Sequence, residues 1–432
     1  MKKTNYSKNL LWYPLDNAAK IYPPTASKDR AHTFAFSALI TEDIDPFILR
    51  QAISNLLVKF PTFKAKLMAG KFWYYLEENN ASIQVFKEQP NYLKQIDFKQ
   101  NNGFLFEVLY VRNKITIKFF HALTDGVGGF EFFKALICEY LKSTGKDIDT
   151  ENLLRPLDKP ATNSLSEDSF LTVQQHSKGK VEKISKPYHI TGKDFDYQGS
   201  GMITAKVDLS QVKELSKEKN VTVTAYLASV YMQAIYLAHL KESRSKNKRI
   251  TVLIPCNLRK KYSSETSRNF TMFARFTEDF SKNIPSFDEL LLDCQTQINE
   301  GLDKSKLDKI IDDNVKMEKN FFIKLAPLPL KNFIMRLVYS RVGEVLQTVN
   351  MSNIGLVTLP ESVSPYVKLM TFAIAPTFSC NHQTGIIGYN GNLYITFSRS
   401  FVETELEKIF VRTLTQKGVS VEISSNYWES KI

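Results

Sequence analysis

Cysteine, glycine and proline are all scarce in this sequence. Its 432 residues include 4 Cys, 17 Gly and 16 Pro. Collagen-like and linker-dominated chains contain far more glycine and proline, and 30 Phe, 19 Tyr and 3 Trp argue against disorder. We therefore expect a globular protein with a large buried core, in two large lobes or about three domains of average size.

The few cysteines exclude two kinds of site. Cys138, Cys256, Cys294 and Cys380 lie more than 35 residues apart, without a Cys-x-x-Cys pair or a neighbouring histidine cluster. Neither a disulfide framework nor a zinc site is encoded. We expect no metal.

Long apolar runs are also missing. The first residues lack the unbroken stretch of about 7–15 apolar residues that a secretory signal needs. The longest apolar stretch, residues 222–240, is interrupted by Gln233 and His239, which favours a buried helix over a membrane span. We expect a cytoplasmic protein without a transmembrane segment.

Helical and strand-like patterns alternate in two parts of the chain. The first alternation runs from residue 34 to about 141, and the second starts near residue 200. Between them, the sequence is polar, carries proline and glycine, and lacks sustained periodicity. We expect a first lobe at residues 1–183, a connection at 184–200 and a second lobe at 201–432, in a mixed α/β (α+β) fold.

Periodicity predicts the individual elements. Apolar spacing indicates a helix over residues 45–60, with Asp45 as N-cap and Pro46 at its first position. The first lobe is further expected to contain strands at 71–76, 104–111 and 114–120 and a helix over 127–141. The second lobe is expected to contain strands at 202–208, 249–255, 349–359, 368–374, 386–389 and 393–398, and helices from 210, over 222–240 and over 403–414.

The most informative stretch is residues 117–130, IKFFHALTDGVGGF. It places His121 at the end of an expected strand, with Asp125 and Gly126 four and five residues later. The composition of the chain gives the spacing His-x-x-x-Asp-Gly roughly 0.01 times by chance. A strand end followed by a glycine-rich turn and a helix is where an α/β scaffold presents a side chain to a crevice.

These residue types fit general-base catalysis. Imidazole titrates near neutrality and can take a proton from a hydroxyl or amine that attacks a thioester carbonyl. Asp125 could fix the loop through an ion pair, and Gly126 would let the backbone turn without a Cβ clash. The alternative is that His121 is only a partly buried strand-end residue and that Asp125 only caps the following helix.

The stretch FFHALTDG resembles the active-site motif of the CoA-dependent acyltransferase superfamily. That superfamily includes chloramphenicol acetyltransferase, nonribosomal-peptide condensation domains and alcohol acetyltransferases. The likeness continues through residues 15–17 (LDN), 255–259 (PCNLR), 267–270 (SRNF) and 350–355 (NMSNIG). It covers the chain from about residue 12 to 415.

This resemblance implies two chloramphenicol-acetyltransferase-like lobes with an active-site channel between them. It implies His121 as base, Asp125 as a structural partner turned away from the substrate, Gly126 as the residue that keeps the turn open, and Arg259 as the counter-ion of Asp125. It also implies acyl-CoA as co-substrate, with no bound cofactor. Condensation domains often carry two consecutive histidines in the motif, whereas Phe120 precedes His121 here, which favours the group that resembles alcohol acetyltransferases.

No serine or threonine is singled out by spacing as an oxyanion-stabilising group. Asn353 and Ser379 are candidates for this role or for substrate contact. A strand residue bonded to the backbone is an equally good explanation of each. The five histidines other than His121 have no partner at a useful spacing.

Positive charge concentrates in residues 241–268, which hold nine basic and two acidic side chains, or +7 of the total +12. We expect the phosphates of CoA to meet Lys260, Lys261, Arg244 and Lys248, or an acyl-carrier protein to dock there. A solvated helix end with a loop is the alternative.

Residues 320–346 mix apolar side chains with Lys324, Lys331, Arg336 and Arg341 in an amphipathic pattern. The pattern is more typical of a core helix with a basic edge. An acyl tunnel and a peripheral contact with a membrane surface are the alternatives.

We therefore expect an acyltransferase that moves an acyl group, most simply acetyl, from a CoA thioester to a small-molecule alcohol or amine. The alternatives are a condensation-like enzyme that uses carrier-protein-bound thioesters, a non-catalytic binding protein of the same fold, and a basic nucleic-acid-binding protein. The last lacks a recognisable reading motif or charge interleaved with aromatics, so we expect no nucleic acid as partner.

Overall fold

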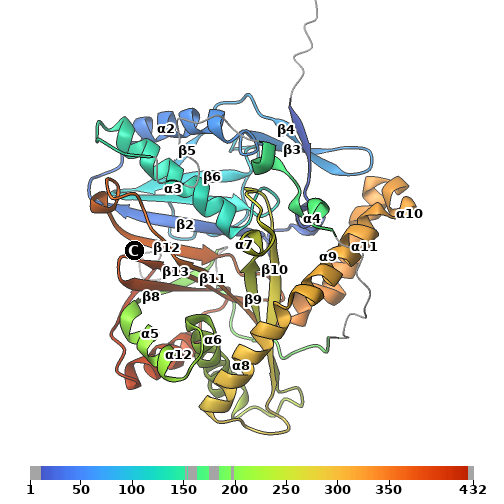
Figure 1. Ribbon diagram of the computed structural model, residues 1–432, viewed down its shortest axis with the longest axis vertical. Helices are drawn as coiled ribbons and strands as arrows, with labels where there is room; N and C mark the ends of the chain where they lie inside the picture. The colour runs from blue at the N-terminus through green and yellow to red at the C-terminus, as the bar shows by residue number, and fades with distance from the viewer. Residues whose placement is uncertain (1–10, 151–152, 154–162, 175–183, 196–198, 427–432) are drawn as a thin grey trace, which may run out of the picture.

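The computed structural model describes residues 11–150, 153, 163–174, 184–195 and 199–426. Its strands form three sheets, and helices cover the outer faces of the two large ones (Figure 1). The predicted connection at residues 184–200 and the end of the predicted first lobe lie partly outside the described residues.

The first-lobe sheet has the strand order β12-β2-β7-β6-β5. Neighbouring strands pair antiparallel, except β5 and β6, which are parallel. The strands are β2 (Thr33–Ile40), β5 (Val85–Lys87), β6 (Phe106–Val111), β7 (Lys114–Phe120) and β12 (Val367–Ile374). The predicted strands at 104–111 and 114–120 are confirmed, and β7 ends directly before His121.

Two helices, α2 (Pro46–Lys59) and α3 (Gly126–Ser143), cover one face of this sheet (Figure 1). The side chain of Asp45 accepts hydrogen bonds from the N–H groups of Phe47 and Ile48, so it caps α2 as predicted. The buried face of α3 packs into a phenylalanine-rich core, in which Phe63 and Phe132 stack with ring centroids 4.3 Å apart. Both predicted helices are confirmed.

A small antiparallel sheet lies beside the first lobe, with the order β1-β4-β3. Its strands are β1 (Trp12–Pro14), β3 (Ala65–Ala69) and β4 (Tyr74–Glu78). The predicted strand at 71–76 is therefore wrong in its bounds. The N–H of Gly70 donates to the carbonyl of Trp73 (3.0 Å), which closes a hairpin turn where the aromatic run suggested a strand.

The second-lobe sheet has the order β10-β9-β11-β13-β14-β8-β15. The pairs β9–β11 and β11–β13 are parallel, and the others are antiparallel. The strands are β8 (Gly201–Asp208), β9 (Arg249–Asn257), β10 (Thr271–Asp279), β11 (Val349–Leu356), β13 (His382–Tyr389), β14 (Asn392–Arg399) and β15 (Val421–Ser425).

Helices α5 (Leu209–Glu218), α6 (Val223–Ile235), α8 (Phe287–Gly301) and α12 (Glu405–Gln416) pack on this sheet (Figure 1). The predicted buried helix at 222–240 is confirmed as α6 and its continuation at Tyr236–Leu240. Among the described residues, no single helix has the length and hydrophobicity to cross a membrane, although the pair formed by α5 and the α6 segment, bent by 89°, meets these criteria when taken together.

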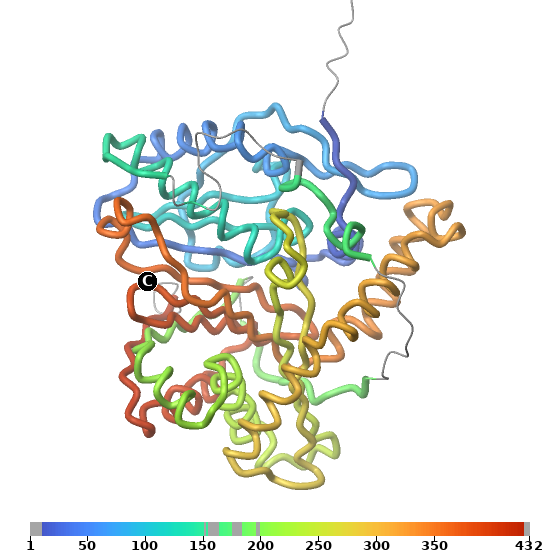
Figure 2. Tube along the Cα trace, viewed as in Figure 1, coloured from blue at the N-terminus to red at the C-terminus, as the bar shows by residue number. Residues whose placement is uncertain are grey.

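Strand β12 connects the two large sheets. It pairs with β2, so the orange-red and blue strands lie side by side in Figure 2, although about 330 residues separate them in sequence. Its far side meets β13: the side chain of Gln383 donates to the carbonyl of Ala375 (2.8 Å), and a Cβ on Gly385 would lie 2.3 Å from the Phe372 carbonyl. The division into 1–183, 184–200 and 201–432 stays a proposal. In this division β12 belongs to the second lobe by sequence, but it is an edge strand of the first-lobe sheet.

Three further helices form an arm along one side of the molecule (Figure 1). They are α9 (Lys304–Lys319), α10 (Phe321–Leu325) and α11 (Leu328–Val342). The expectation of a core helix within residues 320–346 is wrong, because most of the apolar side chains of α10 and α11 face solvent.

Candidate active site

His121 lies between the end of β7 and the start of α3. Its backbone N–H donates to the carbonyl of His32 (2.8 Å). Its ring stacks on Tyr22, with centroids 4.6 Å apart, and meets the ring of Phe34 edge-on at 5.1 Å. Tyr22 belongs to the short helix α1 (Tyr22–Thr25). The imidazole is therefore half-buried and held on two sides by aromatic rings.

Asn269 fixes the ring nitrogens of His121. Its Oδ1 lies 3.0 Å from His121 Nδ1, while its Nδ2 donates to the His121 carbonyl (3.1 Å) and to Asp16 Oδ2 (3.2 Å). Carbonyl and carboxylate oxygens only accept hydrogen bonds, so the amide nitrogen must face them and its oxygen must face the ring. Nδ1 therefore carries a proton and, in the neutral ring, Nε2 keeps its lone pair.

The buried carboxylate of Asp16 orients Asn269. It lies 3.5 Å from Arg268 Nε and also accepts from the N–H of Ala19 (2.7 Å). Arg268 in turn donates to the carbonyl of Pro14 (2.6 Å). The motifs LDN and SRNF stand out in the sequence, but the sequence alone assigns their residues no role. Spacing along the chain does not reveal that residues 253 positions apart are in contact.

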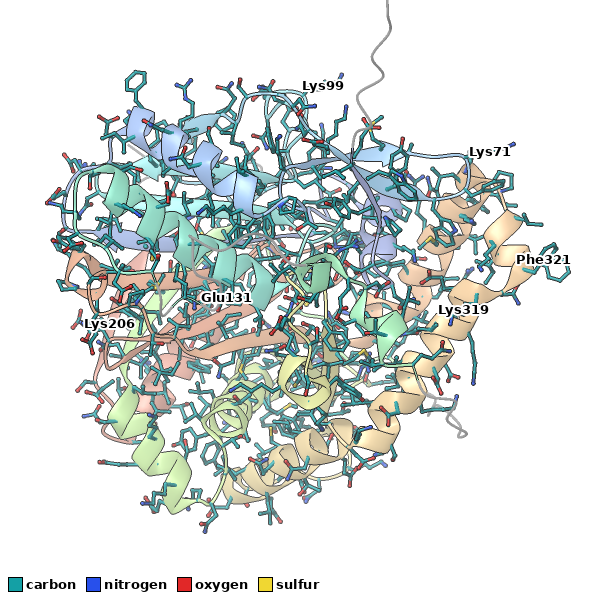
Figure 3. All side chains as sticks on the ribbon, turned by 45° about the horizontal axis from the view of Figure 1, so that its top comes forward. Lys71, Lys99, Glu131, Lys206, Lys319 and Phe321 are labelled. Carbon is teal, nitrogen blue, oxygen red and sulfur yellow. The ribbon has the colours of Figure 1, made fainter. Side chains whose placement is uncertain are left out.

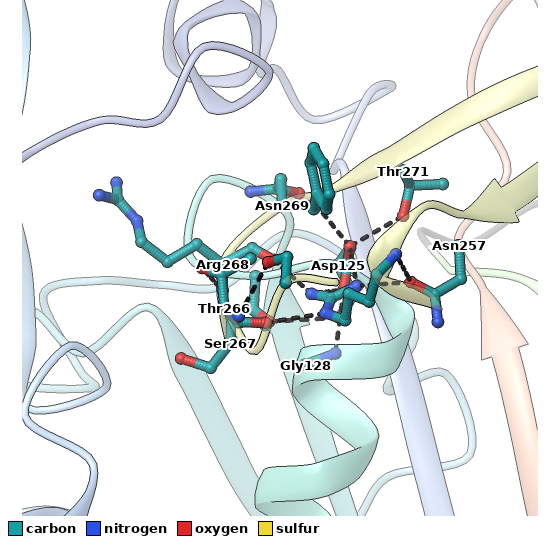
Figure 4. Close-up of polar contacts among 12 residues, drawn as sticks. Asp125, Gly128, Asn257, Thr266, Ser267, Arg268, Asn269 and Thr271 are labelled. Carbon is teal, nitrogen blue, oxygen red and sulfur yellow. Dashed lines mark hydrogen bonds and ion pairs between the residues drawn. The ribbon is translucent and has the colours of Figure 1, made fainter. Parts of the chain in front are cut away.

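Asp125 is the most heavily bonded carboxylate of the site (Figure 4). It caps α3 by accepting from the N–H of Gly128 (2.9 Å). It also accepts from the N–H of Phe270 and from the hydroxyl of Thr271, both at 2.8 Å. Two nitrogens of Arg259 bind its two oxygens, each at 2.9 Å. The expected ion pair is confirmed, and the capping role that was its alternative is present as well.

Arg259 uses all five of its N–H groups. Besides Asp125, it donates to the carbonyls of Thr266 (2.8 Å) and Arg268 (2.6 Å) and to the side chain of Asn257 (3.1 Å). The guanidinium thus connects α7 (Arg259–Tyr262) and the loop before β10 with the start of α3. Because Asn269 belongs to that same loop, this ion pair also positions the partner of His121.

Burial acts on both titratable groups of the loop. Burial lowers the pKa of His121, and the opposing influence of Asp125 and the hydrogen bond to Asn269 does not cancel it. Burial would raise the pKa of Asp125, but the charge of Arg259 and the hydrogen bonds hold this pKa below its ordinary value. Near pH 7, His121 is therefore neutral and Asp125 is charged.

The glycines of the motif provide space rather than an unusual backbone. Gly126 and Gly128 are not among the residues with positive φ, so their role is to avoid Cβ clashes, as expected for Gly126. A Cβ on Gly128 would lie 2.1 Å from the Ser267 carbonyl, and one on Gly126 would lie 2.9 Å from Ile354 Cδ1. These glycines let α3 approach the second lobe closely.

Of the two oxyanion candidates, Asn353 bonds through its side chain and Ser379 through its backbone carbonyl. Asn353 donates to the hydroxyl of Thr224 (3.1 Å) and accepts from the N–H of Gly355 (2.8 Å). The carbonyl of Ser379 lies 3.0 Å from His189 Nδ1. Their assignment to oxyanion or substrate contact remains a prediction.

The basic residues do not form one cluster. Lys260 and Lys261 lie in α7 after β9, whereas Arg244 and Lys248 precede that strand. Nine residues of extended strand separate the two groups by about 26 Å. A count along the sequence missed this separation. Of these four, Lys260 and Lys261 directly follow Arg259 in α7, and Lys261 Nζ donates to the carbonyl of Leu302.

We expect the Asp125–Arg259 pair to be strongly coupled in stability. Asp125→Asn should cost about 3–5 kcal/mol, because it leaves a buried guanidinium without its counter-ion. Adding Arg259→Met should restore part of the loss, as measured by a double-mutant cycle of chemical denaturation. Neutralising the exposed pair Lys206–Glu422 is the control and should change stability little.

The same pair predicts a pH dependence. The pKa of Asp125 lies below its unfolded value, so its stabilisation is present above about pH 4 and is lost as the pH falls further. The Asp125→Asn variant should therefore lose less stability than the wild type on acidification. If Asp125→Asn and Arg259→Met act independently in the double-mutant cycle, the pair is not coupled. The same follows if the stability of the wild type and of Asp125→Asn falls in parallel on acidification.

A profile of the alcohol acetyltransferase family matches residues 112–392. A search of the curated proteins gives no significant match. Residues 112–392 include His121, Asp125, Arg259, Asn269 and Asn353, so most of the site falls within the matched region.

Solved structures with the same fold include a protein solved with coenzyme A, an acetyltransferase and a condensation domain. TRI101 of F. sporotrichioides, solved with coenzyme A and T-2, has a TM-score of 0.61, 11% identity, and coverage of 95% of this chain and 99% of its own. The TRI3 trichothecene 15-O-acetyltransferase from Fusarium sporotrichioides has a TM-score of 0.57, 11% identity and coverage of 96% of both chains. The condensation domain of the Monacolin K polyketide synthase MokA has a TM-score of 0.56, 13% identity, and coverage of 94% and 97%.

These neighbours share the arrangement of two lobes with mixed sheets flanked by helices, as predicted for this chain. At these identities they establish the fold alone, whereas the family profile extends over well more than half of the sequence. The chain thus belongs to the alcohol acetyltransferase family, within the CoA-dependent acyltransferase superfamily, and its class of reaction is acyl transfer.

Proposed function

We propose that this protein transfers an acyl group, most simply acetyl, from the thioester of CoA to the hydroxyl or amine of a small molecule, with His121 as general base. The observation that carries the proposal is the hydrogen-bond chain from Asp16 through Asn269 to His121. This chain keeps the proton on Nδ1, which leaves Nε2 to accept a proton from the acceptor.

The charge state of His121 supports the same role. Its pKa lies below the ordinary value, so the ring is neutral near pH 7, as a base must be. Asp125 does not compete for this task, because its oxygens are occupied by the Arg259 pair and three further donors.

The reaction needs no covalent enzyme intermediate. His121 Nε2 takes the proton as the acceptor oxygen or nitrogen attacks the thioester carbonyl, and a tetrahedral oxyanion forms. When the C–S bond breaks, the thiolate of CoA leaves and receives that proton from the imidazolium. Asn353 and Ser379 are our candidates for contacts with the oxyanion or the substrate. CoA acts as co-substrate, and TRI101, which shares the fold, was solved with coenzyme A.

We expect His121→Ala to lower kcat by about 10²–10⁴-fold without unfolding the protein. The assay follows thiol release from acetyl-CoA over a panel of alcohols and amines. His239→Ala, which changes a half-buried histidine of the second lobe, is the control and should keep its activity. Full turnover by His121→Ala on a confirmed substrate would exclude this residue as base.

Asn269→Ala should separate positioning from mere structure. Losing one hydrogen bond of about 1–2 kcal/mol should lower kcat about tenfold. The bond to Asn269 raises the pKa of His121, so its removal should move the acid limb of the kcat/KM profile, which lies below pH 6.5, to lower pH. An unchanged limb together with lower activity would mean that Asn269 only supports the fold.

The donor can be tested at Lys260 and Lys261. Changing both to Gln should raise the KM for acetyl-CoA at low salt by about two- to fivefold for each charge, with little change in kcat. Acetyl-pantetheine lacks the nucleotide phosphates, so its KM should not change. Arg244→Gln with Lys248→Gln, at the far end of β9, is the matched control. An unchanged KM for acetyl-CoA would instead favour a donor that is bound to a carrier protein.

A further inference from the structure

The arm formed by α9, α10 and α11 extends along one side of the molecule, with α10 at its far end (Figure 1). Phe321 of α10 projects from this end, and Lys319 lies close by on the arm (Figure 3). The side chains of Phe321 and Phe322 are 67% and 80% exposed. Exposed phenylalanines at the tip of a projecting element are unusual for a surface that meets only water.

The apolar side of helix α11 faces solvent, which is the reverse of a helix that covers a core. A surface helix normally turns its apolar stripe toward the protein. Here the stripe at spacings of three and four residues faces solvent, and its exposed members are Leu330, Phe333, Ile334, Leu337, Val338 and Val342. Together with Phe321, Phe322 and Leu325 of α10, we call this surface the apolar stripe.

Polar anchors hold α11 in this orientation. The buried Lys331 donates to the carbonyl of Phe72 (2.9 Å) and lies 3.8 Å from the centre of the Trp73 ring. Asn332 donates to the hydroxyl of Tyr74 (2.9 Å), and Arg336 Nε donates to the carbonyl of Pro24 (2.6 Å). Rotating the stripe inward would break these bonds and bury unpaired charge, so the orientation is built into the fold.

Charge around the apolar stripe has one sign. Residues 319–343 contain five Lys or Arg side chains and no Asp or Glu. Lys324, Arg336 and Arg341 are exposed, and within the described residues no ion pair neutralises them. The acidic residues on either side of this segment are already engaged, because Glu318 pairs with Lys20 and Glu344 pairs with Arg30.

We propose that the apolar stripe of α10 and α11 docks onto a lipid membrane that carries anionic headgroups. Apolar side chains flanked by uncompensated Lys and Arg are the combination that enters the boundary between headgroups and acyl chains. With 15 residues, α11 is about 22 Å long, too short to span a bilayer, so it would lie in the plane of the surface.

Charge and shape favour a membrane over a second copy of this chain. Each copy has a net charge of +12, and a symmetric contact would bring two basic arms together. The arm also projects from the molecule, whereas a partner protein would need a matching groove. An anionic membrane attracts the basic arm and needs no matching groove.

The test is flotation of the full-length protein with vesicles of phosphatidylcholine alone and with about one third phosphatidylserine. We expect binding to the anionic vesicles, weakened by salt, and little binding to the neutral ones. Changing Phe333 and Leu337 to Ser should abolish binding. Changing Lys324 and Arg341 to Gln should weaken it about fivefold for each charge.

Matched controls come from other helices. Phe47→Ser with Val58→Ser removes side chains of α2 that are 74% and 76% exposed, and Lys213→Gln with Lys217→Gln removes two exposed charges of α5. Both control variants should bind vesicles like the wild type. Thermal unfolding of every variant shows whether it is folded, and it should be, since all the replaced side chains face solvent.

Three results would overturn the proposal. The first is failure of the wild type to float with anionic vesicles, and the second is equal binding by the stripe variant and the wild type. The third is a dimer, seen by light scattering without lipid, that Phe333→Ser with Leu337→Ser dissociates; this would assign the stripe to a second copy. None of these results depends on acyl transfer, so the proposed activity is tested separately.

Discussion

The site depends on one buried carboxylate. Asp125 cannot stay charged inside the protein without partners, because an unpaired ion in a medium of low polarity is very costly. Its partners come from the start of α3, from the start of β10 and from Arg259, on both sides of the contact between the lobes. The first lobe alone can supply only one of them. The loop that carries His121 is therefore completed only when the second lobe is in place.

The same constraint recurs at Asp16, and together the two carboxylates set the state of His121. Asp125 and Arg259 hold the loop before β10, and Asp16 turns the amide of Asn269 so that its oxygen faces the imidazole. Each carboxylate lies beside the histidine without accepting its proton directly. Asn269 thus orients the imidazole, while the two carboxylates hold the negative charge. Nε2 therefore needs no protein partner of its own to remain basic.

The elements and contacts that could be predicted from the sequence are those encoded locally or by a recognised motif. They are α2 with its cap Asp45, β7, α3 and the Asp125–Arg259 pair. Tyr22, Asp16 and Asn269 were not found, because distant segments bring them to His121. Counting charge also placed Arg244 and Lys260 in one cluster, since a count ignores the length of an extended strand. For α11, the period of the pattern was visible, but the direction of the stripe depends on anchors such as Lys331 and Trp73.

Strand β12 has a consequence for biosynthesis. About 250 residues separate the end of β7 from the end of β12, so at about 5–20 residues per second a ribosome needs about 13–50 s to make them. During that time one edge of β2 has no neighbour, and an open edge in a nascent chain can pair with other strands. Fragments cut between the lobes would keep this open edge permanently. The two halves are thus a single unit of synthesis and folding, although each has its own sheet and core.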